Sequence, residues 1–200
     1  MRTIALFISG MFHPLFLPTY LGALAFWLQP AESFYYTTEV QLYILLQLFL
    51  ISSVLPIGAV LLLIWGKQVS DIMVSERSQR SLPYLINAVC LAALFYNFRN
   101  LQLAPFITNS VLGALVSVLA AYFINFRWKI SAHAIAMGGA LGLLLALSGS
   151  FQRPLLPVFA GVVLLTGLVG TSRLLLQAHT PGQIYAGYAL GMLSLYICLV

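Results

Sequence analysis

The sequence predicts an all-α protein, a polytopic bundle of about six to seven transmembrane helices. Of its 200 residues, 62% are hydrophobic and only 6% are charged, whereas about a quarter of the residues of a soluble globular domain are charged. So little polar surface cannot cover a water-soluble fold of this size. The apolar residues also form long runs, and a membrane-spanning helix needs about 20 predominantly apolar residues. The composition therefore indicates an integral multi-pass membrane protein.

Seven stretches have the length and composition of a membrane span. They cover residues 3–28, 40–66, 82–98, 101–126, 131–150, 154–172 and 180–200. The third stretch is the shortest and fits a tilted or partly interfacial helix, which leaves six spans as the alternative to seven. The first stretch contains His13, Pro14 and Pro18, and it is expected to kink because proline removes a backbone donor. His13 either faces a polar cavity or lies near the interface on a carbonyl that this kink frees.

Charge and cysteine content restrict the class of partner. The net charge of +5 is spread between the apolar runs, which argues against nucleic-acid binding and favours lipid headgroups or anionic substrates. Cys90 and Cys198 lie in different runs and predict neither a disulfide framework nor a metal site. The four carboxylates of the chain are too few and too scattered for a two-metal site. We therefore expect membrane lipids and a lipid phosphate as partners and no cofactor, with the oligomeric state open.

The longest polar stretch lies between the second and third runs and covers residues 67–84. It contains Lys67, Arg77 and Arg80 among mixed polar and apolar residues. It forms either an amphipathic helix along the membrane interface, with residues 72–74 facing lipid, or a link between two spans whose charged side chains snorkel to the interface.

Counting runs places the polar clusters at one end of the bundle. Arg80, Lys129 and Arg173 are separated from one another by two runs each, and every pair of runs returns the chain to the same face. Arg99 and Arg153 fall on the opposite face. The potentially reactive residues are therefore expected to gather at one end, as a functional site requires.

The most informative polar cluster reads SRLLLQAHTPGQ and ends at Gln183. Arg173 carries a permanent planar charge suited to phosphate oxygens. His179 is the side chain most easily poised between acid, base and nucleophile near neutral pH. Thr180 as N-cap, the proline after it and Gln183 as the closing residue of a capping box predict a helix start. His179 is thus expected just before a helix N-terminus.

A second cluster, NFRWKISAHA, stands at the start of the fifth run. Ser131 can cap that helix, and the free amides of its first turn, including those of Ala132 and His133, form an anion site. Gly138 and Gly142 in the fifth run, like Gly187 and Gly191 in the seventh, are four residues apart, a spacing that lets helix backbones approach closely. Such an approach would bring the two helix starts and their histidines together.

Taken together, the three polar clusters resemble the motifs of the type 2 phosphatidic acid phosphatase family. The family pattern is lysine, six residues and Arg-Pro; then Pro-Ser-Gly-His; then Ser-Arg, five residues, histidine, three residues and aspartate. Here Ser172 and Arg173 precede His179 and Gln183 with the spacing of the third motif, and residues 131–133 reproduce most of the second. The resemblance covers the chain from about residue 70 to its C-terminus.

The chain departs from the family pattern at five positions. Met73 and Ser81 replace the lysine and the proline of the first motif, Ile130 and Ala132 replace the proline and the glycine of the second, and Gln183 replaces the aspartate of the third. Arg77 would substitute for the missing lysine. A glutamine amide can orient the histidine imidazole, but it does not supply the charge of an aspartate.

The resemblance implies one phosphatase-like transmembrane domain over residues 1–200, with leading spans in 1–66 and a motif-bearing core in 67–200. It implies that His179 attacks the phosphorus to form a phosphohistidine, and that His133 protonates the departing alcohol and then activates water. The phosphoryl oxygens would be held by Arg77, Arg80, Ser131, the Ala132 amide and Arg173, and Gln183 would orient the nucleophile. The implied activity is that of a metal-independent lipid phosphatase or diphosphatase of a bacterial inner membrane.

Gln183 also supports an alternative, a catalytically weak or inactive relative that binds phospholipid or serves as a membrane scaffold. A transporter or channel would need charged residues within its spans, and the apolar runs lack them. Several lipid phosphates share the group that these motifs recognise. The excess of cations on the motif-bearing face predicts a cytoplasmic site, whereas many bacterial members of the family face the periplasm, so the side of the site stays open.

Overall fold

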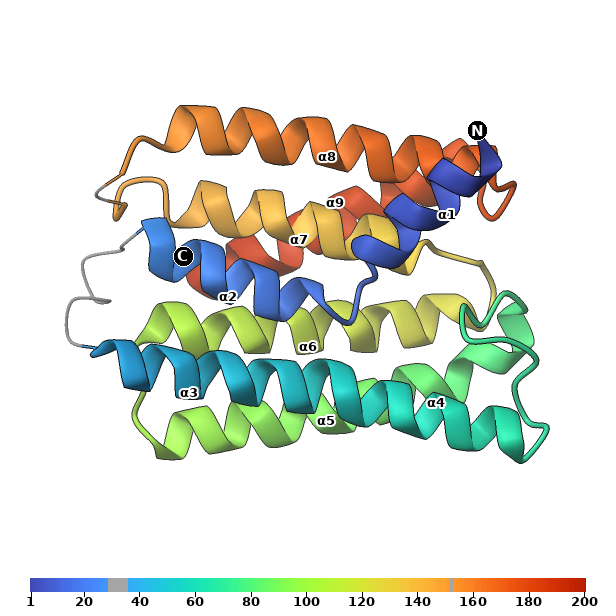
Figure 1. Cartoon of the computed structure of the whole chain (residues 1–200), viewed down its shortest axis with the longest axis horizontal. Coiled ribbons are helices and arrows are strands. Elements are labelled where there is room, and N and C mark those ends of the chain that lie inside the picture. Colours follow the sequence, from blue (N-terminus) through green and yellow to red (C-terminus); the bar gives the residue numbers. More distant parts are fainter. Residues whose placement is uncertain (29–35, 152) are drawn as a thin grey trace.

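The computed structural model describes residues 1–28, 36–151 and 153–200, which Figure 1 shows as a bundle of roughly aligned helices. The α-helices are α1 (Arg2–Met11), α2 (Leu17–Leu28), α3 (Thr38–Phe49), α4 (Leu55–Trp65), α5 (Ser81–Asn100), α6 (Pro105–Asn125), α7 (Ala132–Ala146), α8 (Leu155–Leu175) and α9 (Pro181–Leu199). A π-helical segment, η2 (Leu50–Val54), joins α3 to α4, and a 3-10 turn, η3 (Arg77–Arg80), leads into α5. The predicted all-α fold is confirmed.

In the described part of the chain, five helical stretches are long and apolar enough to cross a membrane. They are Thr38–Trp65, Arg77–Asn100, Pro105–Asn125, Leu155–Leu175 and Pro181–Leu199. Large apolar side chains also cover the outside of the bundle, where Leu164 and Ile197 are each 69% exposed. Soluble monomers rarely expose contiguous apolar patches of this kind. The protein is therefore a helical membrane protein.

The run over residues 3–28 does not form one kinked helix. This run forms two helices of 10 and 12 residues, which are about 15 and 18 Å long at 1.5 Å per residue. The break covers residues 12–16 and contains His13 and Pro14, so the expected kink is instead a full interruption. The run predicted over 131–150 is also shorter in the structure, because α7 ends at Ala146 after 15 residues.

The helix break is tied to the neighbouring long helix by two serines. Pro56 has no N–H, so it cannot pair with the Ser52 carbonyl one turn earlier, and the π-helical segment lies at this point. The Ser53 hydroxyl donates to the carbonyl of Leu15 at 2.8 Å, and the Ser52 hydroxyl, which donates to the Leu48 carbonyl at 2.7 Å, makes a longer contact of 3.3 Å to the same Leu15 oxygen. The irregular segment between α1 and α2 is therefore held by side chains from the interior of the bundle.

The polar stretch after α4 does not form an amphipathic helix. Residues 67–76 make turns in which Lys67 and Val74 have φ values of 58° and 46°. The Asp71 carboxylate accepts hydrogen bonds from the backbone and the hydroxyl of Ser75, both at 3.1 Å. Such local side-chain bonds compete with helix formation. A compact loop results, with Val74 packed against Val69 in its interior.

Helices α7 and α9 approach each other through glycines, as the four-residue spacing predicts. A methyl group added at Gly191 would overlap the carbonyl oxygen of Ile135, and one added at Gly138 would overlap that of Tyr188. At Gly187 it would lie 2.7 Å from the Ala134 methyl group. These contacts join backbone to backbone, so the positions of the two helix starts are fixed by steric contact.

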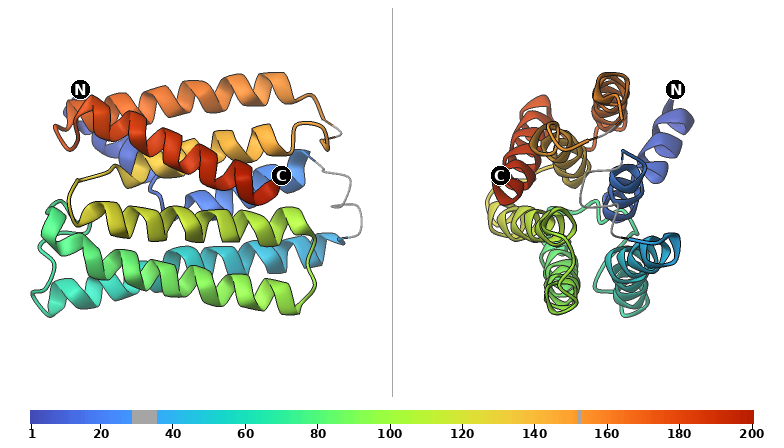
Figure 2. Two further views of the ribbon diagram at one scale, coloured as in Figure 1. Left: turned by 180° about the vertical axis from the view of Figure 1, so that it is seen from behind. Right: turned by 90° about the vertical axis from the view of Figure 1, so that its left-hand side faces the viewer.

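The remaining helices surround this pair. Helix α8 lies along α7 and α1, α6 packs between α5 and α9, and α2 contacts α3 and α7, as Figures 1 and 2 show. The starts of α7 and α9, the end of α8 and the loop before α5 all lie at one end of the bundle, on the right in Figure 1. The turns that carry Arg99 and Arg153 lie at the other end, in agreement with the count of runs.

Replacing Gly191 with alanine is expected to destabilise the protein, because the new methyl group has no space against Ile135. Overpacking an interior contact costs about 1–3 kcal/mol, which should lower the melting temperature of the detergent-solubilised protein by several degrees. Gly161 in α8 is the matched control, since a Cβ there meets no atom within 4 Å. Equal melting temperatures for Gly191→Ala and Gly161→Ala would contradict the close α7–α9 contact.

Candidate active site

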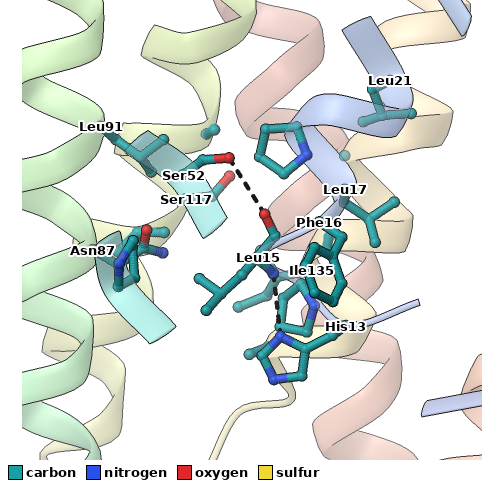
Figure 3. Close-up of a pocket in the computed structure, with 18 of the residues that line it drawn as sticks. His13, Leu15, Phe16, Leu17, Leu21, Ser52, Asn87, Leu91, Ser117 and Ile135 are labelled. Atoms are coloured by element: carbon teal, nitrogen blue, oxygen red, sulfur yellow. Dashed lines mark hydrogen bonds between the residues drawn. The ribbon is translucent and has the colours of Figure 1, made fainter. Parts of the chain in front are cut away.

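A cavity of about 400 Å³ lies among α2, the α3–α4 helix, α5, α6 and α7. Its wall at the motif-bearing end includes His13, Arg80, His133, Arg173 and His179. Most of the remaining wall is apolar and includes Leu48, Leu91, Phe106, Val111, Leu143 and Leu195. Figure 3 shows the part around His13, with Ser52, Ser117 and Leu91 further along the wall. The cavity is thus basic at one end and apolar along most of its length.

The basic end holds an unbalanced positive charge. Arg80, His133, Arg173 and His179 are each at most 8% exposed. No aspartate or glutamate occurs among the described residues that line the cavity. Taking a charge out of water costs several kcal/mol unless a counter-charge is present. This end of the cavity is therefore suited to an anion.

Arg173 is the group that most needs an external partner. It lies in the last turn of α8 and lines the cavity. Its Nε is buried with no hydrogen-bond partner, and its guanidinium donates no hydrogen bond to any residue that the structure describes. A guanidinium presents several donors in a planar fork that matches phosphate oxygens. Unlike Nε, the two terminal nitrogens are not among the buried atoms without a partner, so they are the Arg173 donors available to such a ligand.

Arg80 is held by the backbone instead. Its Nε donates to the Val74 carbonyl at 2.8 Å, and its Nη1 donates to the Ile130 carbonyl at 3.2 Å. These two bonds connect the loop before α5 to the segment before α7 and fix the plane of the guanidinium. The residue lines the cavity, as does Tyr84, whose side chain is within hydrogen-bonding reach of Arg80. Arg80 is therefore oriented before any ligand binds.

The His179 imidazole is oriented by Gln183. The Gln183 Oε1 lies 3.0 Å from Nδ1 of His179 and also accepts from the Thr180 backbone N–H at 3.2 Å. The backbone N–H places the amide oxygen, rather than the amide nitrogen, at this point, so the imidazole must donate from Nδ1. Its Nε2 then carries the free lone pair. The predicted capping box is confirmed, and the same oxygen serves both the cap and the histidine.

The surroundings of His179 favour the neutral imidazole. Burial and then the nearby charge of Arg80 lower its pKa to about 4, against a smaller opposite effect of the hydrogen bond to Gln183. Burial and Arg80 also lower the pKa of Lys129, which lies in the segment before α7. At pH 7 His179 is therefore neutral, with the unprotonated Nε2 that a nucleophile requires.

His133 has a similar arrangement with a different partner. Its Nε2 lies 3.0 Å from the carbonyl oxygen of Ser9 near the end of α1. A carbonyl only accepts, so Nε2 carries the proton and Nδ1 carries the lone pair in the neutral ring. The ring can take a second proton at Nδ1 without losing Ser9. His133 can therefore act as a base and then as an acid at the same atom.

His13 also lines the cavity, and the sequence left its role open between a polar cavity and the interface. Its ring centroid is 5.4 Å from that of His133, with the rings edge to face. The sequence motifs assigned it no chemistry, because it lies more than a hundred residues before His133. The signal that the sequence did contain is Pro14, which follows His13 and marks the break in the helix.

Two residues expected to hold phosphate have structural roles instead. Arg77 is exposed and donates from Nη1 to the carbonyls of Asn125 and Phe126 at 2.9 and 2.7 Å, so it caps the end of α6 and does not line the cavity. The Ser131 hydroxyl accepts from the Ala134 amide at 3.4 Å and caps α7. Ala132, by contrast, lies on the cavity wall as expected. The carbonyls at the end of α6 therefore hold the Arg77 guanidinium away from the cavity.

Three histidines in one cavity also invite comparison with a metal site. No group of three or more His, Cys, Asp or Glu residues in the described part of the chain is arranged to hold a metal ion.

Searches against protein-family models, curated proteins and solved structures find no match to this chain. The resemblance to type 2 phosphatidic acid phosphatases therefore stands on the motif residues. Of those residues, Arg80, Ala132, His133, Arg173 and His179 line one cavity, and Gln183 contacts His179. The functional argument consequently depends on the geometry of this cavity.

His179 is expected to stay neutral as the pH is lowered from about 8 to about 5.5, because its pKa is lowered to about 4. Nitrogen NMR of histidine side chains in detergent should show Nδ1 protonated and Nε2 unprotonated throughout this range. The spectrum of His179→Gln would assign the signal. A titration midpoint near 6.5, the value of an unperturbed imidazole, would contradict the buried, cation-flanked site.

Proposed function

We propose that the protein is a membrane lipid phosphatase or diphosphatase that hydrolyses a phosphate headgroup through a phosphohistidine intermediate. The observation that carries this proposal is the buried guanidinium of Arg173, which lines a cavity shared with His133 and His179 and has no carboxylate among the described residues of that wall. A buried cation without a counter-charge is costly. A phosphate would supply that charge beside a neutral imidazole with a free nitrogen.

In the proposed reaction, the Nε2 lone pair of His179 attacks the phosphorus and the bond from phosphorus to the lipid oxygen breaks. His133, as an imidazolium favoured by the bound phosphate, gives its Nδ1 proton to that departing oxygen. Water then attacks the phosphohistidine, His133 accepts the proton of the water at Nδ1, and the phosphorus–nitrogen bond breaks. The cycle returns both histidines to their starting states and releases inorganic phosphate.

Charge stabilisation would come from the two arginines and the start of α7. Negative charge spreads over the phosphoryl oxygens during transfer, and fixed donors aimed at them provide most of the rate enhancement. Arg80 is held in place by two backbone carbonyls, and Arg173 has unpaired donors. The Ala132 amide lies in the first turn of a helix, where backbone N–H groups favour anions.

The apolar length of the cavity supports a lipid rather than a soluble phosphate as the substrate. The wall beyond the basic end is built from leucine, valine and phenylalanine side chains of α3, α5, α6 and α9. Burying apolar surface stabilises a complex by roughly 25 cal/mol per Å². A hydrocarbon chain along this wall would therefore add affinity and hold the headgroup at the histidines.

We further propose that the chain crosses the inner membrane of a bacterium about seven times. The five long helices would each form one span. The α1–α2 pair would together form a broken span, and the shorter α7 would cross beside α9. A broken span is acceptable in a bilayer only where its free backbone groups are satisfied within the protein. The serine hydroxyls on the Leu15 carbonyl meet that need.

A phospholipid-binding protein without turnover is the second candidate, and Gln183 is the observation that favours it. The amide oxygen orients His179, but it carries no charge to stabilise the cationic phosphohistidine. Binding without hydrolysis would leave the anion site and the apolar cavity functional. The release of phosphate separates the two candidates.

Phosphate release from phosphatidic acid, phosphatidylglycerol phosphate and a polyprenyl diphosphate, with detergent-solubilised protein, tests the proposal. We expect turnover that persists in EDTA, is abolished in His179→Ala and falls at least about tenfold in Arg173→Lys, because an ammonium cannot reproduce a bidentate fork. Arg153→Lys, at the other end of the bundle, is the matched control and should keep its activity. Wild-type turnover in His179→Ala, or EDTA inactivation reversed by a divalent ion, would refute this mechanism.

Gln183→Leu is expected to lower turnover roughly tenfold, about 1.4 kcal/mol, because it removes the acceptor that orients His179. Gln183→Glu should preserve or raise turnover, since it keeps the oxygen and adds charge. Thr180→Ala is the control. It removes the hydroxyl that accepts from the Gln183 backbone N–H in the capping box, and this hydroxyl makes no hydrogen bond to His179. It should reduce the melting temperature and leave turnover per folded molecule unchanged. A leucine variant with full turnover would exclude Gln183 from catalysis.

A further inference from the structure

His13 presents a hydrogen-bond donor to the cavity that neither of the other histidines presents. It is half-buried in the segment between α1 and α2, and its ring lies edge to face with His133 at 5.4 Å between centroids. Its position depends on the helix break, because the next residue is Pro14, which has no N–H. The first amide available after His13 is that of Leu15.

The Leu15 amide fixes the protonation of His13. The Leu15 N–H donates to Nδ1 of His13 at 3.4 Å, as Figure 3 shows. The carbonyl of the same residue is held by the hydroxyls of Ser52 and Ser53, so the peptide groups on both sides of Leu15 are constrained. A neutral imidazole carries one proton, and Nδ1 accepts a hydrogen bond here. The proton of His13 is therefore on Nε2.

This tautomer of His13 offers a free N–H donor to a ligand, whereas the tautomers of His133 and His179 offer a lone pair. Those two rings donate to protein acceptors and keep a lone pair free. His13 accepts from the protein and keeps an N–H free. Its Nε2 makes no hydrogen bond to the described residues and is not among their buried unpaired atoms. It is therefore accessible from the cavity.

We infer that His13 binds the phosphoryl oxygens of the substrate as a neutral hydrogen-bond donor through Nε2–H. The inference rests on the proposed function, which supplies the phosphate. The cavity wall that His13 shares with the unpaired guanidinium of Arg173 places it where such an anion would bind.

The Leu15 backbone N–H also keeps the His13 imidazole in its neutral form. A second proton on Nδ1 would point at the Leu15 N–H and break the bond that holds the ring. His133 differs because its second proton would enter at the free Nδ1 while Ser9 keeps its hydrogen bond. His13 is accordingly a binding residue, and proton transfer remains with His133. Its loss should weaken phosphate affinity and raise KM more than it lowers kcat.

Two substitutions separate the nitrogen atoms of His13. The Oδ1 of His13→Asn can accept from the Leu15 N–H in place of Nδ1, but the short side chain loses the donor. The amide of His13→Gln reaches to the position of Nε2 and keeps a donor there. If His13 only holds the helix break by accepting from Leu15, the asparagine variant should bind phosphate normally and the glutamine variant should bind it poorly. A role as phosphate donor predicts the reverse.

The measurement is calorimetric titration of the detergent-solubilised full-length protein with inorganic phosphate. We expect the glutamine variant to bind within about threefold of wild type and the asparagine variant to bind about tenfold or more weakly, as for one hydrogen bond to a charged group. Equal affinity in both variants, equal loss in both, or the reverse order overturns the inference. If His13→Asn does not fold, His13→Phe, which keeps a ring and lacks both nitrogens, replaces it with the same expectation.

The phosphate-release assay distinguishes failure of this inference from failure of the proposed function. Hydrolysis that depends on His179, together with phosphate binding that is indifferent to His13, refutes only the role of His13. Phosphate binding that follows the expected order without any hydrolysis refutes the phosphatase and leaves His13 as an anion ligand. Wild-type protein that does not bind phosphate refutes both.

Discussion

The contact between α7 and α9 sets the position of the groups on which the site depends. His133 is the second residue of α7, and His179 lies two residues before α9 begins. Gly187 and Gly191 leave no room for a side chain against the backbone of α7. Backbone contacts of this kind are stiffer than contacts between long side chains, because close-packed atoms cannot change rotamer to relieve a shift. The separation of the two histidines is thus a property of helix packing.

The chemistry of each histidine depends on a second group that determines which nitrogen is free. Gln183 determines it for His179, the Ser9 carbonyl for His133, and the Leu15 amide for His13. Two of these three partners are backbone groups, one in the last turn of α1 and one inside the break between α1 and α2. A continuous helix over the same residues would use both groups in its own hydrogen bonds. Because the helix is broken here, the Ser9 carbonyl is free to accept from His133, and the Leu15 N–H is free to donate to His13.

The features that the sequence predicted correctly are those with a local cause. Apolar length predicts the helices, the Thr180–Gln183 pair predicts a capping box, and the glycine spacing predicts close helix packing, and the structure contains all three. The sequence left residues 67–76 open between a helix and a link, and they form a loop because Asp71 bonds to its neighbours. The sequence did not place Arg77 away from the cavity, because the carbonyl that engages it belongs to Asn125, 48 residues later. The partnership of His13 with His133 depends on tertiary contact and leaves no pattern in the sequence.

The two arginines of the cavity illustrate how a membrane protein can maintain an anion site when it is empty. Arg80 donates to two backbone carbonyls, whose partial negative charges offset part of its own charge. Arg173 has no such partner in the described chain, and Lys129 adds a third cation whose pKa is lowered by burial and by Arg80. Repulsion among these groups disfavours the empty site, and it is relieved when an anion binds. If the cavity binds a phosphate as proposed, part of the binding energy would come from repulsion already present in the folded protein. Arg173, which has no carbonyl partner among the described residues, would then be the arginine best placed to bind that phosphate.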